Sequence, residues 1–339
     1  MARVGKAGHF TDLDGMRGVL ACTVMLFHLG LNGMVERLTH GLLRGGLWTL
    51  SVDFFFVLSG FVLYRSLERT RPGLKAYFIK RLLRLAPMLW IGTLAMLALS
   101  PRAFTLLTIA KNLTMLQPLN GILHPTHPGL HALSIDPPAW SVPFELFLPA
   151  FALALLPPLS RMTRKPVLAL AAIFTLGVAL CAVCLAHGLD IQIARAACGL
   201  GLGFALGRLW AIAPPTGAQP ALVLALFAGA IVVMAFSLRL PWLAGLFPLV
   251  AIGCILLGAQ TSTLLSSAPF QAIGRWSYSI YLLHFPVLTL VGRTLGDPAG
   301  SIVRKAVVVA VTIALSALTY RYVERPLMGG REEPAATAP

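Results

Sequence analysis

The chain has few charged residues, and acidic residues are especially scarce. Of its 339 residues only 12% are Asp, Glu, Lys or Arg, and 57% are hydrophobic. Soluble globular chains carry about 25% charged residues. A soluble fold of this composition would have too little polar surface to cover its core. The composition therefore excludes an ordinary soluble globular protein and favours one whose solvent is the lipid bilayer.

Two further absences narrow the class of protein. No basic stripe with interleaved aromatic residues lies outside the apolar segments, so the net charge of +15 does not indicate a nucleic-acid partner. The five cysteines all lie in apolar stretches, and the Cys181-x-x-Cys184 pair has no second pair to complete a metal site. We therefore expect ordinary buried thiols, no bound metal and no nucleic acid.

The apolar residues are arranged in long runs that are typical of membrane-spanning helices. A spanning helix needs about 20 mostly apolar residues. Ten stretches qualify, the third being short enough that its helix is expected to begin earlier: 18–35, 47–64, 85–100, 140–158, 166–187, 190–210, 219–238, 242–260, 275–296 and 301–322. The sequence thus predicts an all-α polytopic membrane protein of about ten transmembrane helices enclosing a polar lumen.

The basic residues indicate how this bundle is oriented. They cluster in the segment 65–84, in the segment 161–165 and near the C-terminal end of the last span. Because loops rich in Lys and Arg stay on the cytoplasmic side, both termini are predicted to be cytoplasmic, in the inner membrane. Residues 1–326 would form one membrane domain, and 327–339 a disordered cytoplasmic tail.

Ionisable side chains inside spans are expensive, so each is a candidate functional residue. Arg17 and His28 are 11 residues apart on the first span, which places them on one face and about 16 Å apart along the axis. Asp53, Glu145 and His284 lie at depths compatible with the middle or outer half of the membrane. This set indicates proton transfer or a polar path for a substrate.

Two arginines mark the point where the third span begins. Arg81 and Arg84 are three residues apart and so share a helix face. Arginine forks suit phosphate geometry, although basic residues at such positions commonly serve only as anchors at the cytoplasmic surface.

The longest stretch between spans, 101–139, holds three histidines between prolines: His124, His127 and His131. Their irregular spacing and the intervening prolines do not favour a zinc site, which needs at least three well-placed ligands. We expect a polar external loop near the mouth of a substrate path.

Six strings in the sequence are similar to motifs of the acyltransferase-3 family. They are L-D-G-M-R-G with the following His28, V-D-F-F-F-V-L-S-G-F, R-L-L-R, W-S-V-P-F-E-L-F-L-P, S-Y-S-I-Y-L-L-H-F-P and V-E-R-P. The strings stand in the family's order and span nearly the whole chain. The fourth departs from the usual pattern, because Glu145 has no second acidic or polar neighbour.

This resemblance implies a ten-helix membrane enzyme that takes an acyl group, commonly acetyl, from a cytoplasmic acyl-CoA. It passes that group to an acceptor hydroxyl, often on a glycan. By motif, the resemblance assigns functional roles to Arg17, His28, Arg81, Arg84 and Glu145. The acceptor would be an envelope or exopolysaccharide sugar, or a small lipophilic molecule.

A hydroxyl is a poor nucleophile at neutral pH and needs a base. His28 is the candidate general base, oriented by Asp53 or Glu145. The arginines Arg17, Arg81 and Arg84 would hold the CoA phosphates. Donors to the developing oxyanion are to be sought among Ser59, Trp140, Ser141, Tyr281 and His284.

Two other classes fit the same residues. A proton-coupled transporter or flippase of a polar or lipid-linked solute would use the ionisable groups as a proton relay, but no internal repeat typical of transporters is evident. A purely structural membrane protein is disfavoured by the charge inside the spans.

Overall fold

The computed structural model describes residues 11–31, 46–70, 73–100, 104–118, 134–154, 192–212 and 264–328, with a few single positions between them. Within these ranges every regular element is a helix, in agreement with the predicted all-α class. Two described helices are long and apolar enough to cross a membrane, Leu74–Leu99 and Ile302–Leu327. Almost all of the predicted span 166–187, the predicted spans 219–238 and 242–260, the part 119–133 of the segment 101–139 and the tail after residue 328 lie outside the described residues.

The described helices follow the other predicted spans closely. They are α1 (Thr11–Leu26) with the π-helical turn η1 (Phe27–Leu31), α3 (Gly46–Thr70), α4 (Leu74–Leu99), η2 (Pro137–Ser141) with α8 (Val142–Ala154), α11 (Gln192–Ile212), α15 (Ser277–Leu295), and α16 (Ile302–Thr319) with η5 (Tyr320–Glu324) and α17 (Arg325–Leu327). The third predicted span does begin earlier, at Leu74. Two short helices were not predicted, α5 (Leu106–Leu113) and α14 (Ala268–Arg275), and a short 3₁₀ turn, η4 (Pro298–Gly300), joins α15 to α16.

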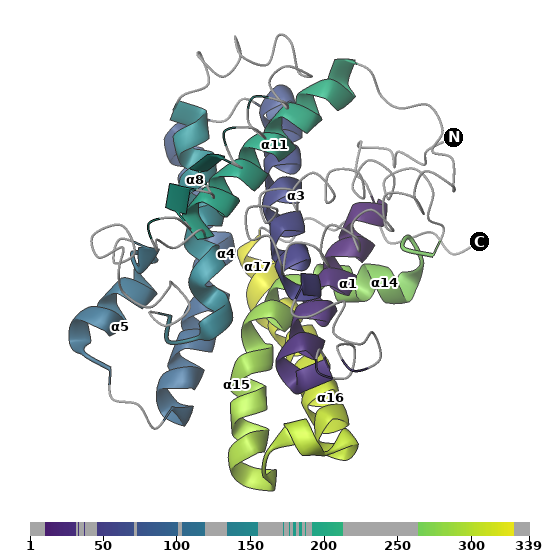
Figure 1. Cartoon of the computed structure of the whole chain (residues 1–339). Helices are drawn as coiled ribbons and strands as arrows, with labels where there is room; N and C mark the ends of the chain where they lie inside the picture. Colours follow the sequence, from purple (N-terminus) through teal and green to yellow (C-terminus); the bar gives the residue numbers. More distant parts are fainter. Residues whose placement is uncertain are drawn as a thin grey trace.

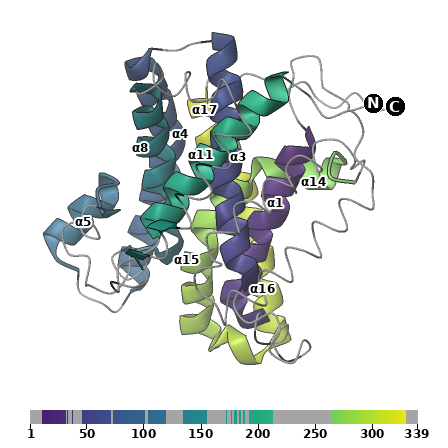
Figure 2. The same ribbon diagram turned by 45° about the horizontal axis from the view of Figure 1, so that its top comes forward.

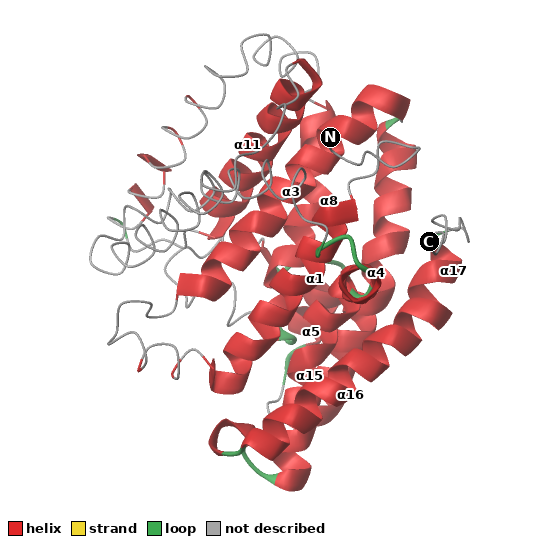
Figure 3. Ribbon diagram, turned by 90° about the vertical axis from the view of Figure 1, so that its right-hand side faces the viewer, coloured by secondary structure: helices red, strands yellow, loops and turns green. Residues whose placement is uncertain are grey.

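The helices form one bundle in which α3 is central (Figure 1). Helix α11 crosses along α3 and makes the most extensive contact in the described part of the chain, while α1 packs against α3, α14 and α15. Helices α15 and α16 run beside each other away from α11 (Figures 2 and 3). Helix α4 lies between α8 and α15 and contacts both.

Small residues explain the close approach of α3 and α11. A side chain at Gly203 would overlap the carbonyl of Val57, and one at Gly60 would overlap the carbonyl of Leu200. A Cβ at Gly199 would lie 2.8 Å from the Cβ of Phe56. The glycine stripe of α11 therefore serves helix packing, as is usual in membranes.

The segment before α8 enters the bundle and is fixed there by side chains from α5 and the turn that follows it. The Asn112 amide oxygen accepts from the N–H of Ile135 at 3.0 Å, and the Gln117 amide donates to the carbonyl of Ala139 at 3.4 Å. Trp140 is buried in the aromatic core against Phe56. As a result α8 begins inside the bundle, and Glu145 lies level with the arginines of α4.

Candidate active site

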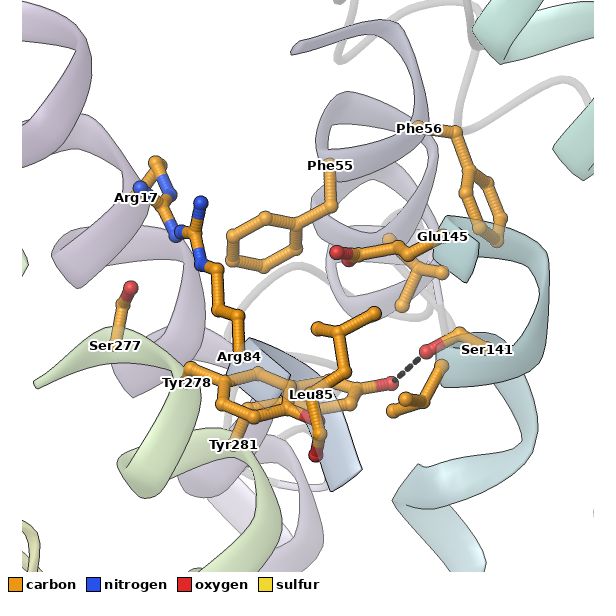
Figure 4. A pocket seen from close by; sticks show the side chains of 12 residues that line it. Arg17, Phe55, Phe56, Arg84, Leu85, Ser141, Glu145, Ser277, Tyr278 and Tyr281 are labelled. Atoms are coloured by element: carbon orange, nitrogen blue, oxygen red, sulfur yellow. Dashed lines mark hydrogen bonds between the residues drawn. The ribbon is translucent and has the colours of Figure 1, made fainter. Parts of the chain in front are cut away.

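The three predicted arginines line, together with Glu145, two adjoining parts of one cavity. Figure 4 shows Arg17, Arg84 and Glu145 around the first part. The first part of the cavity, counted together with the space open to solvent at its mouth, has a volume of about 520 Å³ and is lined by Arg17, Arg84 and Glu145, together with Phe55, Ser141 and Tyr281. An adjoining part contains Arg81 and Ser59. Side chains from α1, α3, α4, α8 and α15 therefore meet at one place, and Glu145, which was expected to orient His28, lies there with the arginines.

Arg81 and Glu145 are joined because a proline interrupts α8. The Arg81 Nη2 lies 3.7 Å from the Glu145 Oε2, and the Arg81 Nε donates to the main-chain oxygen of Glu145 at 3.2 Å. Residue 149, one helical turn later, is proline and cannot donate the helical hydrogen bond to that oxygen. The arginine occupies the position that the missing N–H leaves open.

Arg84 is the cation of this cluster that faces the cavity without a carboxylate of its own. Arg17 has Asp14 at 3.5 Å and Arg81 has Glu145, but no Asp or Glu in the described ranges lies within 4.0 Å of Arg84. The guanidinium groups of Arg17 and Arg84 point toward one another (Figure 4). Two adjacent like charges beside an open cavity form a site suited to a multiply charged anion such as phosphate.

Glu324 is a further member of this cluster that sequence analysis did not single out as a site residue. It is buried at the end of the π-helical turn η5 and accepts a hydrogen bond from the Ser279 hydroxyl, to which Thr319 donates at 2.9 Å. Arg84 and Arg17 act on it electrostatically. The V-E-R-P string marked the position, but only the folded chain shows that it faces the arginines.

The Tyr281 phenol connects the cavity to the helix face on which the histidines lie. Its Oη is 3.0 Å from the Ser141 Oγ, and both groups line the cavity. The Tyr281 ring lies 6.3 Å from the ring of His284, one turn further along α15. Two of the predicted oxyanion donors, Ser141 and Tyr281, are thus brought together, and Ser59 lines the adjoining space. Trp140 lies in the packed core instead, with 2% of its surface exposed.

The two predicted histidines are in direct contact. The Nε2 of His284 lies 3.0 Å from the Nδ1 of His28, and the rings are stacked with centroids 5.0 Å apart. His28 stands in the π-helical turn η1, next to Gly30 with φ +76°. Such π-turns often occur at functional sites; this one and η5 are the two in the described ranges.

The hydrogen bonds of this pair determine its neutral tautomers. The Nδ1 of His284 lies 3.0 Å from the carbonyl of Ile280, which can only accept, so this nitrogen carries the proton. The His284 Nε2 is then an acceptor, and the His28 Nδ1–H must donate to it. The lone pair of His28 is therefore on Nε2, which is the basic atom of the pair.

The two carboxylates that sequence analysis offered as orienting groups for His28 are placed elsewhere. Glu145 is paired with Arg81 and lines the cavity. Asp53 is fully buried between α3 and α11, where Arg195 donates to it from Nε at 3.1 Å and from Nη2 at 2.9 Å. His28 instead donates from its Nδ1–H to the Nε2 of His284. Arg195 was recognisable as an arginine within an apolar span, which requires an acidic partner.

The described ranges contain no cluster of three His, Cys, Asp or Glu side chains that could bind a metal. The histidines at positions 124, 127 and 131 lie outside those ranges. The site is thus built from arginine, carboxylate, hydroxyl and imidazole groups, which can bind an anion and move a proton.

The chain matches known proteins over nearly its whole length. The acyltransferase domain family, acyltransferase-3, matches residues 10–321. BcsY of Komagataeibacter xylinus, named as a membrane-bound transacylase, is 30% identical over 338 residues, which cover 93% of this chain and 82% of BcsY. The peptidoglycan O-acetyltransferase OatA of Listeria monocytogenes is 25% identical over 366 residues, and the match spans 93% of this chain but about half of OatA, 55%. No solved structure matches the chain. The chain belongs to the acyltransferase-3 family of membrane acyltransferases.

Proposed function

We propose that the protein transfers an acyl group, commonly acetyl, from cytoplasmic acyl-CoA to a hydroxyl of an acceptor, first of all an envelope or exopolysaccharide sugar. The observation that carries this proposal is the order of groups along the bundle. Arg84 lines the cavity, and no Asp or Glu of the described ranges lies within 4.0 Å of it. The hydroxyls of Ser141 and Tyr281 line the same cavity, and the Tyr281 ring lies 6.3 Å from the ring of His284. His28, the partner of His284, is about 16 Å from Arg17 along the axis of α1.

The donor would enter from the cytoplasmic side, with its phosphates on Arg84 and Arg17 and with Arg81 held beside them by Glu145. This orientation keeps the nucleotide in water and directs the thioester along the cavity toward His28. It also follows from the predicted inner-membrane topology with both termini inside, in which the basic ends of α1 and α4 face the cytoplasm.

The chemistry needs one base and one set of oxyanion donors. The His28 Nε2 takes the proton of the acceptor hydroxyl as its oxygen attacks the thioester carbonyl, and the Nδ1–H of His28 remains bonded to His284. The tetrahedral oxyanion accepts from the Tyr281 or Ser141 hydroxyl. Collapse breaks the carbon–sulfur bond, and His28 returns its proton to the departing thiolate, so the products are the ester and CoA thiol.

The acceptor class rests on the relatives. OatA is named for acetyl transfer to peptidoglycan, and transacylation is named for BcsY. A glycan hydroxyl on the outer side of the membrane is therefore the first acceptor to test, and a small lipophilic alcohol is the second.

The deciding experiment measures CoA release by purified protein in liposomes with acetyl-CoA and glycan acceptors. His28→Ala should lower kcat by about 10²–10⁴-fold, as expected for loss of a general base. Arg84→Ala should instead raise the apparent KM for the donor. Matched controls are Lys80→Ala, an exposed cation on the same helix, and His187→Ala, an exposed histidine elsewhere.

If folded protein neither bound acyl-CoA nor released CoA with any acceptor, the enzyme proposal would be overturned. Solute flux across the same liposomes would then identify the alternative, a proton-coupled transporter or flippase. In that case His28→Ala would abolish flux without any ester product having been formed.

A further inference from the structure

Asp136 is a buried carboxyl that the proposed chemistry does not use. Asp136 is fully buried, and neither oxygen of its carboxyl has a hydrogen-bond partner among the described residues. No basic side chain in the described part of the chain lies within ion-pair distance of it. An ionised carboxylate in such a place is strongly disfavoured. The Asp136 carboxyl must therefore be protonated, unless another group balances its negative charge.

Its nearest surroundings contain an acceptor that lacks its helical donor. Helix α15 carries proline at position 286, so the carbonyl of Leu282 cannot receive the usual hydrogen bond from residue 286. A Cβ built on Gly92 of α4 would lie 2.9 Å from the Asp136 Oδ2 and 3.2 Å from the Leu282 oxygen. The two oxygens thus converge on the space that the glycine leaves empty.

Two oxygen acceptors facing each other repel unless one of them carries a proton. The carbonyl cannot, so the proton belongs on the carboxyl. Burial raises the pKa of Asp136 well above its ordinary range, with no opposing cation. Among the described titratable groups, the one on which it acts electrostatically is the phenol of Tyr281, which carries no charge at ordinary pH.

A second helix of this bundle also has a carbonyl that a proline leaves without its helical hydrogen bond. Pro149 frees the carbonyl of Glu145, and the Arg81 Nε–H occupies it. At Pro286 the corresponding donor would be a carboxylic acid rather than a guanidinium. Carboxylic acids held neutral in apolar sites can serve as hydrogen-bond donors.

We propose that Asp136 is a neutral carboxylic acid that donates its O–H to the Leu282 carbonyl and thereby positions the segment 137–141 against α15. Asp136 stands directly before that segment, whose last residue, Ser141, meets the Tyr281 hydroxyl at 3.0 Å. It is a positioning residue, because it does not line the cavity and touches no reacting atom. Its effect on turnover rests on the proposed acyl transfer, whereas its protonation does not.

The first experiment follows the proton and needs no turnover. Protein labelled with ¹³C at the aspartate carboxyl carbons is titrated by NMR in detergent micelles, and Asp136→Asn identifies the Asp136 resonance. The expected result is a resonance at the protonated position through neutral pH. A resonance for Asp136 that titrates in the ordinary acidic range would overturn the proposal.

The second experiment tests the positioning role through kcat. Asp136→Asn keeps an N–H donor for Leu282 and should stay within about threefold of wild type. Asp136→Ala removes the donor and should lower kcat by about tenfold, the equivalent of one net hydrogen bond at a buried site. Gly92→Ala, which places a methyl group against Oδ2, should resemble Asp136→Ala, and the exposed Asp297→Ala is the control.

The two experiments separate the possible failures. If the protein released no CoA at all, the NMR titration would still decide the protonation of Asp136. If turnover were normal and Asp136→Ala matched wild type, the positioning role would be overturned while the acyl transfer stood. If Asp136→Ala did not fold, the comparison of Gly92→Ala with Asp136→Asn would decide the same question.

Discussion

Arg81 and Glu145 are joined twice, by an ion pair and by a bond from the Arg81 Nε to the Glu145 carbonyl at 3.2 Å. The second bond exists because Pro149 withholds its N–H from that carbonyl. The side chain and the backbone of one residue thus hold the arginine in a fixed direction beside the cavity.

This relationship predicts an effect of a residue that touches no ligand. Pro149→Ala restores an N–H that competes with Arg81 for the Glu145 carbonyl. The apparent KM for acyl-CoA should rise by about fivefold, corresponding to roughly 1 kcal/mol for one hydrogen bond, with kcat little changed. Steady-state kinetics of CoA release measure both constants. A fivefold fall in kcat with KM unchanged would contradict the role assigned to the hydrogen bond between Arg81 and the Glu145 carbonyl.

The histidine pair predicts a non-additive effect on turnover. His284→Ala removes the acceptor of the His28 Nδ1–H and should lower kcat by about tenfold or more, without raising the donor KM. Because the two imidazoles act as one unit, the double variant with His28→Ala should be no slower than His28→Ala alone. Additive losses in single-turnover measurements would show that His284 acts independently of His28.

Several features of this site could be predicted from the sequence, and the limits are physical. Arg17, Arg81 and Arg84 were expected to act together on one anion, and they line adjoining parts of one cavity, whereas Glu145, expected beside His28, lies with these arginines instead. The partner of His28 could not be found in this way. Ideal geometry places Asp53, Glu145 and His284 at similar depths, whereas the choice among them depends on helix rotation and on where α8 begins. That start is set by the α5 segment, through Asn112 and Ile135, which hydrophobicity does not reveal.

The pairing of Asp53 with Arg195 was missed for a related reason. A polar residue inside a span predicts that a polar partner lies nearby, but the sequence does not indicate which helix supplies that partner. The glycine stripe of α11 turns out to be the cause, since it brings α11 close enough to α3 for Arg195 to reach Asp53. Recognising the pair required the packing as well as the charges.

This buried pair predicts a stability effect rather than a catalytic one. Asp53→Asn or Arg195→Gln alone leaves a charge buried without its partner and should destabilise the protein by about 3–5 kcal/mol. The double variant removes both charges and should recover a large part of this loss. Thermal unfolding in detergent, followed by the fraction of monodisperse protein, measures it. A double variant as unstable as the sum of the two single variants would contradict the coupling.

The negative charge of Glu324 near Arg17 and Arg84 is predicted to affect binding of the donor. Glu324→Gln keeps an acceptor for Ser279 but removes the negative charge that offsets the repulsion between Arg17 and Arg84. We expect a rise of about three- to tenfold in the KM for the donor and little change in kcat. The loss of one neighbouring charge should weaken the binding of the donor by roughly 1 kcal/mol. The exposed neighbour Arg325 provides the control, as Arg325→Ala. A lower KM in Glu324→Gln would mean that net positive charge, rather than the direction of the arginines, limits binding.

A neutral Asp136 predicts a particular dependence of stability on pH. Its pKa is raised in the folded protein, against about 3.9 for an aspartate in an unfolded chain. Between these two values the folded state binds one more proton than the unfolded state. The contribution of this proton to the free energy of unfolding is therefore fully present below the unfolded pKa. It falls as pH rises toward the folded pKa, by up to about 1.4 kcal/mol per pH unit. Asp136→Asn lacks this proton and should lose the corresponding slope.

The comparison of wild type with Asp136→Asn isolates this contribution from that of the buried histidines, which both proteins share. Unfolding midpoints measured from about pH 5 to pH 7 should fall more steeply for wild type than for the variant, because this window lies above the unfolded aspartate pKa. Parallel curves would mean that Asp136 releases its proton at the same pH in both states. The carbonyl freed by Pro286 would then have to find its hydrogen bond from another donor.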